Sequence, residues 1–235
     1  MRMRMLAVSA LVALLDALPL GAAPRSASLP ASAASLPASA GVVPEAKPPL
    51  QLLTSTPEAM RTRFGWTYDE RLRKQDRALG IWQALRKGMD VLAPAADQQL
   101  ARPEHLEKHV PPRLRCELLP ACEPLLAATC VSEAQSRDGT VKLLLELADG
   151  LTVECVIIPI SGKHTSLCVS SQVGCSRACA FCSTGTMGLV RSLATEEILS
   201  QVWLALRLVR ERGLPPLINI VFMGMGKQLR QFIQP

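Results

Sequence analysis

The segment from Leu167 to Gly226 constrains the fold of this 235-residue chain more than any other part. A short β-rich run, TSLCVSS, leads into a long loop that contains three cysteines. The next segment, TEEILSQVWLALRLVRER, has apolar residues at helical spacing. The run LINIVFMG then has the composition of a strand buried on both faces of a parallel sheet. This order predicts one strand–helix–strand unit of an α/β fold.

Local signals place the ends of the expected helix and the loop before it. Thr195 is the expected N-cap, and Glu196 and Glu197 favour the positive end of the helix. Gly213 marks its end. The loop leaves the first strand at its carboxyl end, where α/β folds keep their sites.

Cys175, Cys179 and Cys182 in that loop indicate a metal centre. Structural zinc needs four ligands, so Cys168 or His164 would have to complete such a site. Three thiolates can instead hold a cubane iron–sulfur cluster and leave one iron open to a substrate. The spacing favours the cluster over zinc, and zinc over plain core thiols. The remaining cysteines are scattered, and we expect buried or half-buried free thiols at Cys116, Cys122, Cys130 and Cys155.

The N-terminal 48 residues are expected to be a leader outside the fold. A basic start and an apolar run resemble a secretory signal peptide, and the run is too short and interrupted to span a membrane. A segment rich in Ala, Ser and Pro follows and resembles an organelle transit peptide. We expect a plastid destination, with the mitochondrion second, and no stable membrane association after the leader is removed. The alternative is low-complexity sequence from a misplaced start codon.

Residues 49–120 are expected to form a small helical domain. The stretch from Tyr68 to Gly88 predicts a helix with one face made by Leu72, Leu79, Trp82 and Leu85. Its Arg and Lys residues are either a solvated face or a surface for RNA phosphates, and the net charge of +6 suits an anionic partner. Residues 121–166 predict a β-hairpin connection, TVKLLLEL and LTVECVIIPI around an Asp-Gly turn. Residues 167–235 form the expected core.

The cysteine spacing, with Phe181 before the third cysteine, resembles the signature of radical S-adenosylmethionine enzymes. The flanks LCVSSQVGC, EILSQV and NIVFMGMG resemble the RlmN–Cfr family, radical methyltransferases of adenine in RNA. The resemblance covers about Phe64 to Gly226 and is strong from Leu167 onward. It implies the N-terminal part of a partial (β/α)6 barrel, preceded by the helical domain and the hairpin. It also implies a [4Fe-4S] cluster, S-adenosylmethionine, an RNA substrate and an electron donor such as flavodoxin or ferredoxin.

The same resemblance implies roles for individual residues. Cys175, Cys179 and Cys182 would hold the cluster, whose open iron would chelate S-adenosylmethionine. Cys168 would release a protein–RNA adduct by forming a disulfide with a methyl-bearing cysteine of the family. Glu154 would accept a proton. The backbone of Gly224, Met225 and Gly226 would hold the methionine end of S-adenosylmethionine. The resemblance leaves open carbon 2 or carbon 8 of adenine, and ribosomal or transfer RNA.

After Gly226 the chain departs from the family. The family has Glu-Pro here, whereas this chain has Lys227 and Gln228, which places an ammonium group where the cofactor's ammonium must lie. The later barrel strands and the methyl-bearing cysteine do not follow. We therefore expect the tail from Lys227 to be translated intron, and the chain to be an inactive fragment or one whose reading frame was assigned incorrectly. The alternatives are a zinc-bound RNA-binding module without catalysis and a radical enzyme of another type.

Overall fold

The fold is seen in a computed structural model, which describes residues 48–71, 76–98, 100, 106–108, 110–175 and 188–222. Most of the expected leader, nearly all of the cysteine loop and the tail after residue 222 lie outside these ranges. Within them, no helix is long and apolar enough to cross a membrane.

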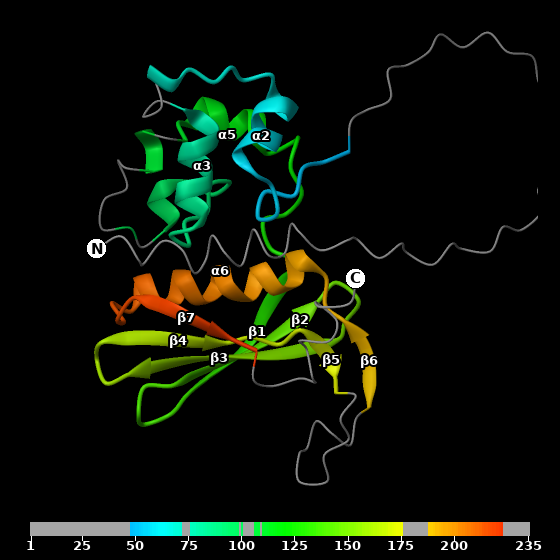
Figure 1. The fold of residues 1–235 in the computed structure, drawn as a ribbon, viewed down its shortest axis with the longest axis vertical. Coiled ribbons are helices and arrows are strands. Elements are labelled where there is room, and N and C mark those ends of the chain that lie inside the picture. Colours follow the sequence, from blue (N-terminus) through cyan, green and yellow to red (C-terminus); the bar gives the residue numbers. More distant parts are fainter. Residues whose placement is uncertain are drawn as a thin grey trace, which may run out of the picture.

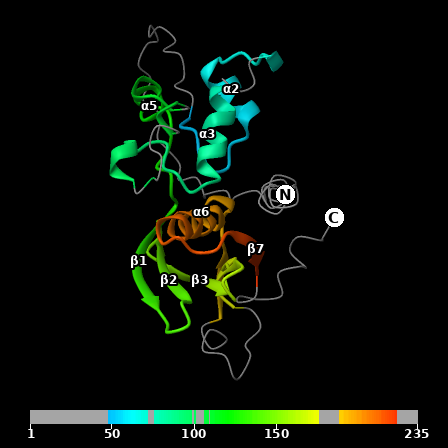
Figure 2. The same ribbon diagram turned by 90° about the vertical axis from the view of Figure 1, so that its left-hand side faces the viewer.

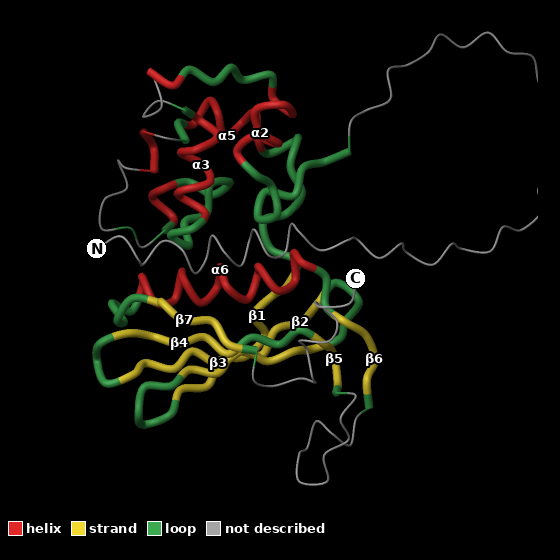
Figure 3. Tube along the Cα trace, in the orientation of Figure 1, coloured by secondary structure: helices red, strands yellow, loops and turns green. Residues whose placement is uncertain are grey.

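The described helices divide between a small helical module and one long helix on the sheet (Figure 3). In the module, apolar side chains of three helices and the segments between them enclose a core of their own. The elements of the module are α2 (Pro57–Phe64), α3 (Arg77–Leu85), the 3-10 helix η3 (Ala95–Asp97) and α5 (Pro112–Leu118). The long helix is α6 (Thr195–Glu211).

The main sheet has five strands in the order β1-β2-β3-β4-β7. Neighbouring strands are antiparallel except for β4 and β7, which are parallel and are joined through α6. This arrangement confirms the predicted strand–helix–strand unit. The strands are β1 (Ala128–Gln135), β2 (Val141–Leu147), β3 (Thr152–Ile160), β4 (His164–Cys168) and β7 (Leu217–Val221). A separate two-stranded ribbon pairs β5 (Gln172–Gly174) with β6 (Leu189–Ser192).

The expected hairpin is present as β2 and β3, with Gly150 in the left-handed region at its turn. It belongs to the same sheet as the core strands β4 and β7, and it has a third strand beside it. Sequence reasoning missed this strand, β1, because only its first residue, Ala128, is buried. Without apolar alternation, β1 gives no strand signal in the sequence.

The long helix α6 lies between the sheet and the helical module (Figures 1 and 2). Ile198, Val202 and Val209 pack with the sheet, whereas Trp203 is buried in the core of the module. The module approaches α6 most closely at Gly88, whose carbonyl accepts a 2.6 Å hydrogen bond from Arg210. A Cβ placed on Gly88 would lie 2.8 Å from the Cα of Arg207. The helix is therefore enclosed on two sides.

Three local expectations were wrong at the edges of these elements. The N-cap of α6 is Ala194 and not Thr195, because the Glu197 carboxylate accepts the Ala194 N–H at 2.7 Å. The helix of the module begins at Arg77, since the Asp76 carboxylate caps it by accepting from Leu79 N. Strand β7 is not buried on both faces, because it is an edge strand among the described residues.

The predicted face of α3 is only partly correct. Leu85 is buried, but Leu79 and Trp82 are half-buried, and Leu72 lies outside the described residues. The fully buried positions include Ala78 and Ile81. Small residues on this face let the helix pack closely, which a search for large apolar residues does not detect.

Gly88 and Gly65 allow a matched test of the contact between the module and α6. Gly88 has φ +67° and Gly65 has φ +66°, so the backbone strain of a substitution is the same at both. A Cβ on Gly65, however, would meet nothing within 4 Å. We expect Gly65→Ala to lower the free energy of unfolding by about 1 kcal/mol, the cost of left-handed backbone. Gly88→Ala should lower it by about 3 kcal/mol, because overpacking against Arg207 is added. Urea unfolding measures both, and equal losses would contradict the contact.

Candidate functional site

Glu154 and Cys168 lie on the face of the sheet that is opposite α6. On β3 the side chains of Val153, Cys155 and Ile157 point into the core beneath α6, so Glu154 and Val156 point the other way. Val156 is the cross-strand partner of Cys168. Because paired residues share a face, the predicted carboxylate and the predicted thiol occupy neighbouring strands of one open face.

The Glu154 carboxylate is half exposed and is paired with a cation. Lys142 Nζ on β2 lies 3.0 Å from Glu154 Oε1, and about half of each side chain is accessible, 50% and 48%. The carboxylate therefore faces solvent with one ammonium beside it. Such an exposed pair contributes little to stability, so its position on the open face is the more informative property.

The chain that follows β4 is fixed by a buried glutamine of α6. The Gln201 side chain accepts from Ser170 N at 2.9 Å and donates to Ser170 O at 3.0 Å. The Ser170 hydroxyl in turn donates to the carbonyl of Glu154 at 2.6 Å. Gln201 is fully buried. These bonds satisfy the backbone where the chain leaves the strand, and they set its direction into the cysteine loop.

The two ends of the cysteine loop meet at a narrow neck. Cys175 N donates to Gly188 O at 2.8 Å, so residues 176–187 begin and end at one point. Gly174 has φ +76°, and a Cβ there would collide with the carbonyl of Gly188. Only glycine fits this close approach. Cys175 itself is buried, with 7% of its surface accessible.

Only part of the predicted metal and cofactor site can be placed. Cys175 lies at the neck, two residues after Val173 of β5. Cys179, Cys182 and the three residues Gly224, Met225 and Gly226 lie outside the described residues. Among the described residues, no three His, Cys, Asp or Glu side chains come together as metal ligands. The described part of the predicted site is therefore Cys175 and the close approach of Gly174 to Gly188.

The other cysteines differ from one another in exposure. Burial raises the pKa of the Cys155 thiol to about 12, and that of Cys122 to about 11. These two thiols are protonated at neutral pH and are poor metal ligands. Cys116 and Cys130 are exposed, which contradicts the expectation that both are at least half buried.

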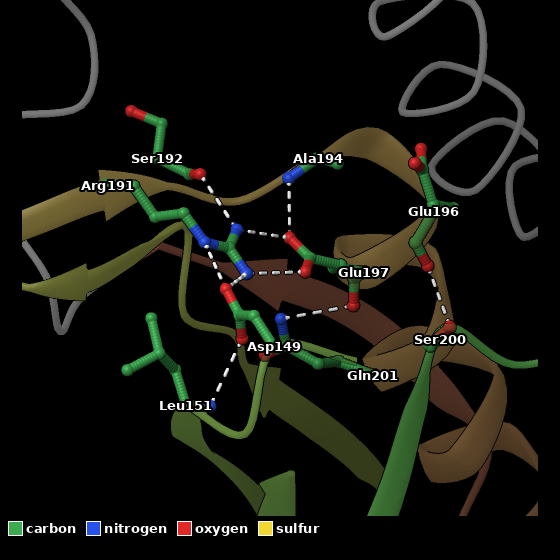
Figure 4. A network of polar contacts seen from close by, with 9 residues as sticks. All are labelled: Asp149, Leu151, Arg191, Ser192, Ala194, Glu196, Glu197, Ser200 and Gln201. Carbon is green, nitrogen blue, oxygen red and sulfur yellow. Dashed lines mark hydrogen bonds and ion pairs between the residues drawn. The ribbon is translucent and has the colours of Figure 1, made fainter. Parts of the chain in front are cut away.

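A charged network holds β6 in place, and sequence reasoning missed it (Figure 4). Arg191 donates two bonds of 2.8 Å to the Glu197 carboxylate and a third of 2.8 Å to Asp149. The hydrogen bonds to Glu197 raise the pKa of Arg191. Asp149 belongs to the β2–β3 turn, and Glu197 to the first turn of α6. The network thus joins three elements beside the neck.

A search against models of protein families finds no match to this chain. Among curated proteins, a probable RNA methyltransferase of Sorangium cellulosum is 50% identical over 111 residues, which are 47% of this chain and 28% of that protein. A dual-specificity RNA methyltransferase RlmN of Myxococcus xanthus is 46% identical over 124 residues, 51% of this chain and 31% of that protein. The matches thus span less than a third of these relatives.

A solved structure is similar in fold as well as in sequence. The radical SAM methyltransferase from Sphaerobacter thermophilus is 36% identical, with a TM-score of 0.57 over 77% of this chain and 48% of that chain. This likeness agrees with the α/β fold of the core. Over the matched residues, the chain is therefore similar to RNA methyltransferases of the RlmN type and to a radical SAM methyltransferase of known structure.

Proposed function

We propose that this chain carries the first part of a methyltransferase core that acts on an adenine of ribosomal RNA, with transfer RNA as a second substrate class. The observation that carries the proposal is the glycine-closed neck, where Gly174 at the end of β5 meets Gly188, with the first of the three cysteines, Cys175, beside it. Glu154 and Cys168 lie on the adjacent open face. The names of the relatives, RNA methyltransferases, support the choice of reaction.

In this proposal Cys175, Cys179 and Cys182 hold a [4Fe-4S] cluster, and the glycine segment 224–226 holds S-adenosylmethionine. Once bound, the cluster and S-adenosylmethionine supply the radical that activates a methyl group. The chain's own part is to fix the thiolates and to exclude water. Gly174 fixes one of the three, Cys175, against Gly188, and Gln201 fixes the strand end from which the loop departs.

Glu154 is the proposed proton acceptor, with Lys142 as its resting partner. The ammonium lies 3.0 Å from the carboxylate, and the carboxylate oxygens supply the acceptor atoms that this role needs. Its exposure on the open face leaves room for an RNA base. Cys168 is the proposed thiol that releases the covalent protein–RNA adduct, and it points to the same face through its pairing with Val156.

The zinc-bound RNA module is the second candidate, and one geometric fact weakens it. His164 and Cys168 begin and end β4, which separates them by roughly 13 Å at 3.3 Å per residue. The loop follows from the Cys168 end, so His164 lies far from Cys175 as a fourth ligand. Of the two candidates for the fourth zinc ligand, only Cys168 is then left.

The proposal also includes an RNA partner, an electron donor and a destination in the cell. The net charge of +6 suits an RNA partner, and a flavodoxin or ferredoxin would supply electrons. The composition of the leader favours import into a plastid, with the mitochondrion second. A fusion of residues 1–48 to a fluorescent protein tests the destination directly.

The first prediction concerns iron. After anaerobic reconstitution with iron and sulfide and desalting, Cys179→Ala should lose most of its iron, because a cubane on two thiolates is poorly held. Cys116→Ala is the matched control, since Cys116 is an exposed thiol of the helical module, and it should keep its iron. If Cys179→Ala retains as much iron as the control, the ligand assignment is wrong.

The second prediction concerns Cys168. In a longer form that includes the remaining barrel, Cys168→Ala should keep the cluster and accumulate protein crosslinked to RNA, because the release step is blocked. Denaturing gels with labelled RNA measure the adduct. Cys130→Ala, another thiol of the sheet, is the control and should show no adduct. Normal turnover by Cys168→Ala would exclude the release role.

A further inference from the structure

We propose that Arg191 is the positioning residue of the three-cysteine loop, because it holds β6, one side of the neck, against α6 and the β2–β3 turn. The inference rests on the proposed function, since it concerns the loop that would carry the cluster. Arg191 itself is not proposed to touch substrate or cofactor.

Strand β6 has little else to hold it. Leu189 and Val190 are exposed, at 44% and 58%. The strand pairs only with β5 among the described strands, and an isolated two-stranded ribbon is marginally stable in water. Leu193, just after the strand, is buried and gives one apolar anchor. Leu193 N also donates to Ser171 O at 2.8 Å, and the guanidinium of Arg191 adds the ion pairs that tie the strand itself to α6 and the β2–β3 turn.

The two sides of the neck are anchored differently. On the β5 side, Gln172 and Val173 are buried, so Cys175 follows a strand that packing holds in place. On the β6 side, Arg191 is the register partner of Val173 and comes three residues after Gly188. A loosened β6 would therefore move Gly188, and with it the return path of the loop, relative to Cys175.

The geometry of the network suits a guanidinium and no other cation. The Glu197 side chain is 10% accessible and binds both terminal nitrogens, while Asp149 binds the Nε side. Glu197 also accepts the Ala194 N–H, so its carboxylate is fixed at the start of α6. Lysine has one ammonium on a flexible stem and cannot make this forked arrangement. Arg191→Lys should therefore restore the position of β6 only in part.

Arg212 provides a matched control at the other end of α6. Arg212 forms an ion pair with Glu133 of β1, which also joins this helix to the sheet. The accessible fraction of its side chain, 33%, is close to the 32% of Arg191. It lies far along the 17-residue helix from the neck. Arg212→Met removes a comparable ion pair without touching β6.

The experiment compares Arg191→Met, Arg191→Lys and Arg212→Met after anaerobic reconstitution. We expect Arg191→Met to release iron to a chelator at least about tenfold faster than the unmodified protein, which is the equivalent of losing one charge-assisted hydrogen bond. The electron paramagnetic resonance lines of its reduced cluster should broaden, because the thiolates adopt several arrangements. The rate of iron release from Arg191→Lys should lie between those of Arg191→Met and the unmodified protein. Arg212→Met should release iron at the rate of the unmodified protein. The proposal is overturned if Arg191→Met and Arg212→Met release iron at the same rate.

Hydrogen exchange separates this inference from the proposed function. If the unmodified protein binds no iron, the proposed function fails, but the role of Arg191 in holding β6 is still measurable. The backbone amides of residues 189–193 should exchange faster in Arg191→Met, with those of β2 and β3 unchanged. Unchanged exchange at residues 189–193 would show that Arg191 does not hold the neck.

Discussion

The burial of α6 on two sides is the constraint on which the rest of the structure depends. One side packs on the sheet through Ile198 and Val202, and the other places Trp203 in the core of the helical module. Because α6 packs on both the sheet and the helical module, the positions of its polar side chains are set as well. Glu197 and Gln201, one turn apart, then hold the two segments that frame the cysteine loop.

This arrangement separates packing from chemistry across the sheet. Residues of β3 that point toward α6 are apolar and buried, and those that point away include Glu154. Cys168 shares that open face through its pairing with β3. Burial raises the pKa of Cys155, on the packed side, to about 12 and keeps its thiol inert. Cys155 and Cys168 thus lie on neighbouring strands but differ in burial, because they point to different faces.

The sequence predicted the elements with strong periodicity and missed those that depend on tertiary contacts. The strand–helix–strand unit and the hairpin were predicted correctly, since their apolar patterns are regular. The N-cap at Ala194 could not be predicted, because alanine has no capping side chain and the cap depends on Glu197. Strand β1 and the Arg191 network gave no local signal. Strand β1 pairs with the next strand along the chain, β2, but it has no apolar alternation, and Arg191 bonds to Asp149, which lies 42 residues before it.

Three residues of the predicted site lie in the described part of the chain, and their roles stay predictions. The positions of Glu154, Cys168 and Cys175 follow from alternation along β3 and from the order of the elements. Gly88 was expected only as the end of a helix, but it also makes the close contact with α6. A glycine that serves a distant backbone cannot be recognised from its neighbours in sequence.

The central claim is that the loop closed at Gly174 holds an iron–sulfur cluster and not zinc. The most direct measurement is anaerobic reconstitution of the unmodified chain with iron, sulfide and zinc together, followed by metal analysis and Mössbauer spectroscopy. The account predicts about four irons per chain with the spectrum of a cubane cluster. About one zinc per chain without iron would contradict it.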